Sequence, residues 1–181
     1  PRSRPARTSS KGSPASGAGC RRGAGSSGAW LAVGELGEAV VAGYRAVGAP
    51  FVDGRALADD LRRSGLPGFT ARPLTFHAMF QKHARTISGG VQIHVTDREA
   101  FKPVIVGIAM IKTVYDMYTD KFEWKRDPYE YVFDVNPFDV VCGTDKIRKQ
   151  IEGGVSLAEI EAVWTAGEAA FGDARKPYLL Y

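Results

Sequence analysis

The sequence predicts an α+β fold with α/β-like alternation over residues 48–181, and three observations support that fold class. Val91 to Thr96 alternates β-branched and polar residues, which is typical of a strand with one face in a core. Val104 to Tyr118 is a long, mostly apolar run, and Pro103 suits the first turn of a helix there. Residues 156–159 have the pattern of a helix capping box. Strands mixed irregularly with helices indicate an α+β unit.

The first part of this domain is expected to hold a short amphipathic helix and a strand. Asp53 is a good N-cap for the helix, and Gly65 supplies its end. Phe69 to Phe76 is rich in β-forming residues, and Pro73 within it favours a strand at the edge of a sheet. A polar turn or short helix is expected over residues 77–88.

The second part is expected to be mainly helical. Tyr129 to Phe133 is interpreted as a further strand, and Pro137 to Cys142 as a buried segment. Thr144 or Asp145 then caps a helix, and the capping box opens a last helix that runs to about Phe171. No internal repeat interrupts this order.

Residues 1–47 have a different composition from the rest of the chain. Almost every residue from 1 to 28 is Ser, Gly, Ala, Pro, Arg or Lys, which cannot bury enough apolar surface to offset chain entropy. Residues 30–47 are interrupted by glycines and receive no assigned structure. We expect residues 1–47 to be a disordered tail or the translation of a wrong reading frame, since GC-rich DNA read out of frame has this composition.

The charge distribution disfavours nucleic-acid binding by the domain. The formal net charge of the chain is +4, but seven of its 24 basic residues and only two of its 20 acidic residues lie in the first 50 positions. The remaining residues are therefore close to neutral, whereas a nucleic-acid surface needs clustered Lys and Arg.

Cysteines and apolar runs also limit the class of protein. Cys20 and Cys142 lie in unrelated contexts, so they indicate neither a disulfide framework nor a metal quartet. No uninterrupted apolar run approaches the roughly 20 residues that a membrane-spanning helix needs. No apolar stretch precedes Cys20, so the start of the chain does not read as a signal peptide.

One polar strand face is the best candidate for a binding site. Gln92, His94 and Thr96 share the face opposite the apolar residues of their strand, and Asp97 follows directly. This group offers donors, acceptors and a titratable imidazole, so it could bind sugar hydroxyls. The alternative is that it forms the solvated side of an antiparallel strand, with Asp97 as the cap of the long helix that follows.

Other kinds of chemistry have weaker support in the sequence. His77, His83, His94 and Asp97 lack the short spacings typical of zinc ligands, so no metal site is predicted. No cofactor fingerprint is present, and Cys142 in an apolar run does not resemble a nucleophile. Glycosidases need two carboxylates, and spacing selects no pair among Asp97, Asp134, Asp139 and Asp145.

Several motifs taken together resemble one protein family. They are, in order, Gly48 to Asp53, Gly65 to Gly68, Gly89 to Asp97, Phe101 to Val104, Gly143 to Asp145 and Arg175 to Tyr181. Their order and spacing are similar to those of the NamZ-type exo-β-N-acetylmuramidases, formerly domain of unknown function 1343. The resemblance covers residues 48–181.

This resemblance implies that the chain is the small C-terminal domain of a two-domain enzyme whose Rossmann-like N-terminal domain is missing. Members of the family release N-acetylmuramic acid from the non-reducing end of peptidoglycan fragments without a cofactor, and they are often exported. The active site is expected in the cleft between the domains, with the catalytic glutamate in the N-terminal one. The chain alone is then inactive, and the competing interpretation is a non-catalytic carbohydrate-binding remnant.

Within the resembling part, four residues are expected to bind the sugar. Gln92, His94 and Asp97 are assigned hydrogen bonds to its N-acetyl, hydroxyl or lactyl groups, and Lys82 an ion pair with its lactyl carboxylate. The family often has cysteine where this chain has Ser88. A basic glycine-rich segment that usually precedes Gly48 in the family is absent here.

Overall fold

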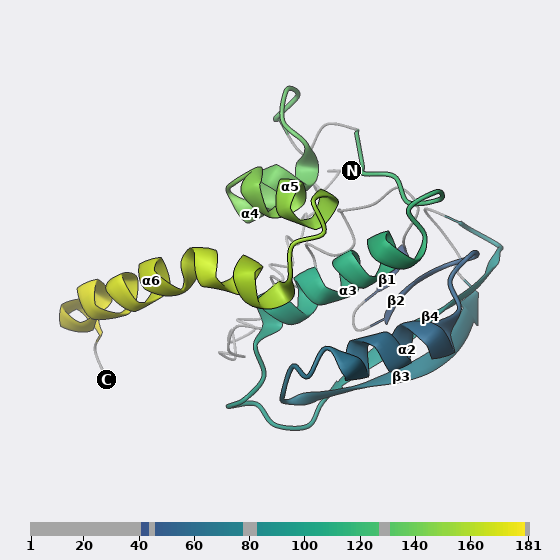
Figure 1. The fold of residues 1–181 in the computed structure, drawn as a ribbon, viewed down its shortest axis with the longest axis horizontal. Helices are drawn as coiled ribbons and strands as arrows, with labels where there is room; N and C mark the ends of the chain where they lie inside the picture. The colour runs from purple at the N-terminus through teal and green to yellow at the C-terminus, as the bar shows by residue number, and fades with distance from the viewer. Residues whose placement is uncertain (1–40, 44–45, 78–82, 127–130, 180–181) are drawn as a thin grey trace, which may run out of the picture.

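The computed structural model describes residues 41–43, 46–77, 83–126 and 131–179 (Figure 1). The disorder expected for residues 1–40 and the position of Lys82 lie outside the described residues.

Four antiparallel strands form one sheet. They are β1 (Val41–Gly43), β2 (Ala46–Ala49), β3 (Phe69–His77) and β4 (Ile87–Val95). Their order in the sheet is β1-β2-β4-β3, so β4 is an inner strand that pairs with β2 on one side and with β3 on the other. The prediction that the segment containing Pro73 forms an edge strand is confirmed, because β3 ends the sheet.

The sheet extends before Gly48, the residue at which the sequence places the start of the domain. β1 and β2 both contain residues before Gly48, and Val47 of β2 is 1% exposed and lies opposite Val91 of β4. The structured domain therefore includes Val41. Ala46–Ala49 has little strand signal of its own, and it is placed by pairing with residues of β4 that lie 40 to 46 positions later in the chain.

Five α-helices and one 3₁₀ turn complete the described part of the fold. They are α2 (Gly54–Arg63), α3 (Pro103–Met117), α4 (Pro137–Cys142), α5 (Lys146–Glu152), α6 (Leu157–Arg175) and η1 (Lys176–Tyr178). α2 lies across β3 and β4, and α3 packs beside α2 (Figure 1). The fold class is therefore α+β, as the sequence predicted.

Local signals in the sequence account for where α2 and α3 begin. The carboxylate of Asp53 accepts hydrogen bonds from the backbone N–H groups of Arg55 and Ala56, at 2.8 and 3.2 Å. These bonds satisfy two of the N–H groups that a helix start leaves open. Pro103 is the first residue of α3, where its missing N–H costs nothing.

The core lies between the sheet and helices α2 and α3. Val91 and Ile93 of β4 are fully buried, and so are Leu57 and Leu61 of α2. Burying side chains of this size contributes about 1.5–3 kcal/mol each. An aromatic cluster extends the core toward α4, with ring centroids 5.0–6.1 Å apart; its members are Tyr115, Phe122, Trp124 and Phe138.

Two predictions for the second half need correction. Residues 127–130 are outside the described part, and the rest of the expected strand contributes only a single bridge at Val132, with Tyr131 90% exposed. Because residues 131–133 pair with another segment at one residue only, their β-forming side chains, such as Tyr131 and Phe133, remain exposed. The segment expected only to be buried is helix α4. Of the two cap candidates for α5, it is Thr144 whose Oγ1 accepts a hydrogen bond from the N–H of Lys146, at 3.2 Å.

The capping box at the start of α6 is confirmed. The Oγ of Ser156 accepts from the N–H of Glu159 at 3.3 Å, and the carboxylate of Glu159 accepts from the N–H of Ser156 at 3.2 Å. The Ser156 hydroxyl and N–H, which both bond to that carboxylate, hold the pKa of Glu159 below its ordinary value. α6 runs to Arg175, four residues beyond the predicted end, and its C-terminal half projects away from the rest of the domain (Figure 1).

Candidate functional site

The polar face predicted for β4 is present in the sheet. Val91 and Ile93 are buried, whereas Gln92 between them is half-buried and His94 is exposed. In the register of β3 with β4, Arg72 lies opposite Gln92 and Thr70 lies opposite His94. Opposed residues of an antiparallel pair project from the same face. We call Thr70, Arg72, Gln92 and His94 the outer polar patch.

Arg72 is the member of the patch that sequence reasoning missed as a site residue. Its Nη2 donates to the Oε1 of Gln92 at 2.5 Å, and this bond orients the amide. Arg72 also brings a permanent positive charge to the patch, because a guanidinium does not lose its proton in proteins. The sequence alone marked Arg72 only as part of an edge strand. Its cross-strand partner follows from the register, which is a tertiary property.

Asp97 does not lie in the strand pairing, and its carboxylate has a structural function. Its Oδ1 accepts from the N–H groups of Glu99 and Ala100, at 2.9 and 3.2 Å, which caps the turn after β4. Its own N–H donates to the carbonyl of Gly68. The expectation that Asp97 caps the long helix is wrong, because α3 begins at Pro103 with Lys102 at the N-cap position.

Gly68 explains why the turn after Asp97 is tight. It has a φ of +82°, and a Cβ on it would lie 2.5 Å from the backbone nitrogen of Phe101. Only glycine accepts both this conformation and this close backbone approach without strain. Gly68 and Asp97, both within motifs of the resemblance, therefore hold one turn together.

The remaining titratable candidates do not form a second centre. Burial, together with the nearby charge of Asp139, raises the pKa of the Cys142 thiol to about 11. Cys142 is thus protonated at neutral pH and is a poor nucleophile. Within residues 41–43, 46–77, 83–126 and 131–179, no three His, Cys, Asp or Glu side chains lie close enough to share a metal ion.

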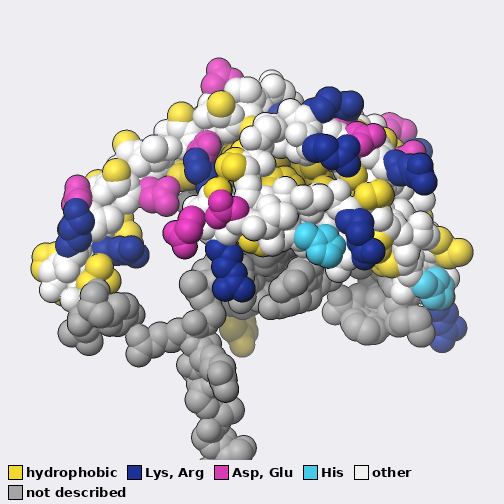
Figure 2. Space-filling view, turned by 90° about the horizontal axis from the view of Figure 1, so that it is seen from below, with side chains coloured by type: hydrophobic (Ala, Val, Ile, Leu, Met, Phe, Trp, Pro, Cys, Tyr) yellow, Lys and Arg dark blue, Asp and Glu magenta, His cyan; other side chains and the backbone are white. Residues whose placement is uncertain are grey.

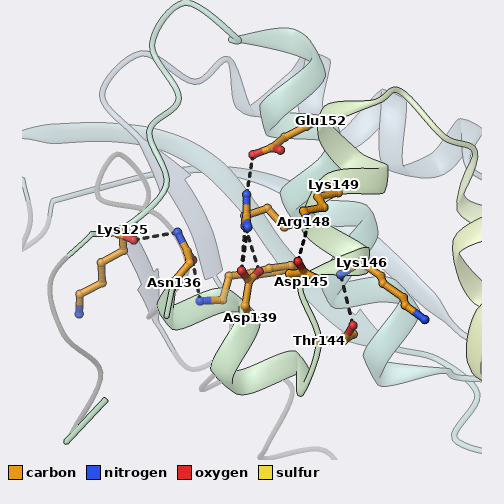
Figure 3. A network of polar contacts seen from close by, with 10 residues as sticks. Lys125, Asn136, Asp139, Thr144, Asp145, Lys146, Arg148, Lys149 and Glu152 are labelled. Carbon is orange, nitrogen blue, oxygen red and sulfur yellow. Dashed lines mark hydrogen bonds and ion pairs between the residues drawn. The ribbon is translucent and has the colours of Figure 1, made fainter. Parts of the chain in front are cut away.

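A polar hollow of about 460 Å³ lies where α4 meets α5, and Figure 3 shows the polar contacts there. At its centre Arg148 donates from Nε and Nη2 to both oxygens of the buried Asp139, at 2.8–3.1 Å, and this contact raises the pKa of Arg148. Arg148 also reaches Glu152, at 3.3 Å. The Oδ1 of Asn136 accepts from the N–H of Phe138, which caps α4. These groups tie α4 to α5, so the network is structural.

Comparisons with known proteins identify the family. Residues 41–181 match the family described as "Exo-beta-N-acetylmuramidase NamZ, C-terminal". The chain is 36% identical over 138 residues to "Peptidoglycan beta-N-acetylmuramidase NamZ" of Bacillus subtilis (strain 168), a match that covers 76% of this chain and 31% of the relative. This chain belongs to the NamZ family.

A solved structure agrees with the fold of this NamZ-family domain. It is the crystal structure of a DUF1343 family protein from Bacteroides fragilis NCTC 9343, with a TM-score of 0.67 and 23% identity. The match covers 86% of this chain and 40% of that chain. The match to the B. subtilis relative covers 31% of that protein, so this chain spans about a third of its length. None of the helices in the described ranges is long and apolar enough to cross a membrane.

Gly48 and Gly90 of the NamZ-like motifs, and Gly54 just after the first motif, allow close backbone packing. A Cβ on Gly90 would lie 2.2 Å from the carbonyl oxygen of Val47, and a Cβ on Gly48 would lie 2.2 Å from that of Gly89. A Cβ on Gly54 would lie 2.3 Å from the carbonyl oxygen of Gly90. The glycines at residues 48, 54, 89 and 90 therefore allow β2 and the start of α2 to approach β4 closely.

Proposed function

We propose that this domain is part of an exo-β-N-acetylmuramidase and that its outer polar patch binds the muramic acid residue at the non-reducing end of peptidoglycan fragments. The observation that supports this most directly is membership of the NamZ family, whose B. subtilis relative is a peptidoglycan β-N-acetylmuramidase. The outer polar patch places hydrogen-bond donors, hydrogen-bond acceptors and the cation of Arg72 on one face of β3 and β4. The alternative is that the patch is only a solvated strand face, and the experiments below distinguish the two.

The chemistry of the patch suits a sugar that carries a carboxylate. The amide of Gln92 and the imidazole of His94 can hydrogen-bond hydroxyl and N-acetyl groups. The guanidinium of Arg72 can pair with the lactyl carboxylate in a bidentate manner, and Lys82 remains a proposed partner of the same carboxylate. Asp97 remains a proposed contact, and its cap bonds also position the chain directly after His94 and Val95.

Catalysis itself is proposed to depend on a glutamate in the N-terminal domain. Glycoside hydrolysis uses a pair of carboxylates on either side of the bond. Among the four carboxylates weighed from the sequence, Asp139 is paired with Arg148, Asp145 with Lys149, and Asp97 caps a turn. These three are engaged in structure, so the domain is proposed to supply binding groups to a cleft whose reacting carboxylate comes from the partner domain.

We expect the purified 181-residue chain to show no turnover of a chromogenic N-acetylmuramic acid glycoside, because the proposed glutamate is supplied by another domain. The B. subtilis relative, assayed beside it, serves as the positive control. Release of the chromophore by the chain above the rate in buffer would contradict this prediction and would require a catalytic pair within these 181 residues.

The binding role is best tested in a chimera in which residues 41–181 of this chain replace the matching segment of the B. subtilis relative. We expect His94→Ala to lower kcat/KM for a MurNAc-GlcNAc disaccharide by about 10- to 100-fold, roughly 1.4–2.7 kcal/mol of transition-state stabilisation. The melting temperature should stay within about 2 °C, because His94 is exposed and makes little packing.

His77→Ala is the matched control for this experiment. His77 is also exposed on the sheet, at the far end of β3 opposite Ile87, about 17 Å from Arg72 along the strand. It should leave kcat/KM unchanged. An active chimera in which His94→Ala has no more effect than His77→Ala would show that the outer polar patch is merely a solvated face. If the chimera is inactive but the isolated chain binds the saccharide, the result would favour the alternative of a non-catalytic carbohydrate-binding remnant.

A further inference from the structure

Helix α6 carries an apolar stripe that continues beyond its own domain. Ile160, Trp164, Gly167, Phe171 and Ala174 follow one another at steps of four, three, four and three residues, which places them on one side of the helix. Ile160 is fully buried and Trp164 packs partly against the core. Phe171, further along the same stripe, is 66% exposed, and Tyr178 in the following turn is 83% exposed. Figure 2 shows hydrophobic side chains along this projecting arm.

An apolar groove of about 1080 Å³ adjoins the stripe. α3, α4 and α6 line it, with Pro103, Ile108 and Ile111 on one side and Val141 on another. Trp164 and Gly167 of the stripe are part of its wall. A Cβ on Gly167 would meet no atom within 4 Å, so the helix surface is open at this point. The groove and the stripe form one continuous surface, which we call the α6 face.

The α6 face has the properties of a surface that is normally covered. Among the described elements, α6 packs against α3 and η1, and its C-terminal half projects beyond α3 (Figure 1). A helix segment with so little tertiary packing is marginal in water. Contiguous apolar surface is uncommon on domains that act alone and marks interaction sites. By helical geometry Glu161 and Glu168 lie beside the stripe, where they also line the groove, and Asp173 lies on the opposite side of the helix.

We propose that the α6 face is the docking surface for the N-terminal domain of a NamZ-family enzyme. The length of the relatives supports this occupant: the match covers 31% of the B. subtilis relative and 40% of the B. fragilis chain, and the matched family description is that of a C-terminal region. Both relatives thus carry a large part outside the matched region, and that part is the occupant we propose. The proposal rests on the proposed two-domain enzyme for its partner and adds which surface that partner covers.

Hydrogen exchange of α6 backbone amides tests this proposal without an activity readout. In the isolated chain, amides from about residue 164 to 178 should exchange quickly, because that half of the helix is unsupported. In the chimera with the B. subtilis N-terminal part, the same amides should slow by at least about 100-fold. Phe171→Asp should abolish the slowing, because it places a charge in the centre of the stripe.

Ala169→Asp is the matched control, since residue 169 is exposed on the opposite side of the same helix and receives the same charge. It should leave the slowing intact. Equal exchange in the chimera and the isolated chain would overturn the proposal. The proposal would also be overturned if the α6 amides of the isolated chain became protected from exchange as the protein concentration rises, and if sedimentation showed dimers under the same conditions. The α6 face would then be covered by a second copy of the chain.

If the chimera does not fold, the intact B. subtilis relative provides the same comparison. Its helix that aligns with α6 should be protected, and aspartate at the position aligned with Phe171 should remove that protection. Docking and catalysis are separable in this design. A chimera whose α6 amides are protected but that lacks muramidase activity would support docking at the α6 face and count against the proposed function. An active chimera without this protection would support the proposed function and count against docking at the α6 face.

Discussion

Gly90→Ala should destabilise the protein by at least about 3 kcal/mol, and we expect much of the variant to be unfolded or insoluble. The added Cβ would lie 2.2 Å from the carbonyl oxygen of Val47 and 2.8 Å from the Cα of Gly48. Both atoms belong to the backbone of β2, so no side-chain rotation relieves the clash. β2 and β4 would have to separate, which costs hydrogen bonds between them and opens the core around Val91. Urea unfolding monitored by circular dichroism measures the effect.

Gly167→Ala is the control for the same chemical change. Gly167 lies inside α6, and its added Cβ would meet nothing within 4 Å. Alanine in a helix interior is favoured over glycine by about 0.5–1 kcal/mol, so this variant should be slightly more stable than the parent. If Gly90→Ala and Gly167→Ala had the same urea midpoint of unfolding, β2 could not approach β4 as closely as the structure shows.

Asp139→Ala should cost about 3 kcal/mol, the second-largest effect that we expect. Asp139 is a buried residue, and its carboxylate takes two hydrogen-bonding nitrogens of Arg148, at 2.8–3.1 Å. Removing the carboxylate leaves a guanidinium, itself only 21% exposed, without its main partner. The link between α4 and α5 is lost at the same time. Chemical unfolding again gives the free energy.

Two further variants separate the buried pair from a surface pair. Asp145→Ala breaks the ion pair with Lys149, whose side chains are 48% and 64% exposed, and should change stability by less than about 0.5 kcal/mol. Asp139→Ala combined with Arg148→Ala should recover part of the loss, because no buried charge remains. Additive effects of the two single variants would mean that Asp139 and Arg148 do not stabilise one another.

The parts of the fold that local sequence signals predicted are those that depend on neighbours in the chain. Asp53 at the start of α2, Pro103 at the start of α3 and the capping box of α6 were all confirmed. In each case the deciding interaction joins residues at most a few positions apart, or needs only the fixed φ of proline. The alternation of residues 91–96 likewise showed which side of β4 faces the core.

For the candidate site, the sequence selected Gln92 and His94 correctly as members of one polar strand face, and their binding role stays a proposal. It could not select Arg72, because Arg72 and Gln92 meet only through the register of β3 with β4. It assigned Asp97 to the wrong cap, because the turn that Asp97 stabilises also depends on the backbone of Gly68, almost 30 residues earlier.

The sequence by itself determined the fold class, the starts of α2, α3 and α6, the buried side of β4 and the family to which the chain belongs. Only the tertiary structure decided that β1 and β2 belong to the sheet, that residues 131–133 do not form a strand ladder, and that Phe171 in the stripe on α6 is exposed. The physical reason is the range of the interactions. Helix caps and alternation act within a few residues, whereas strand pairing and helix packing depend on segments far apart in the chain, which no short stretch of sequence contains.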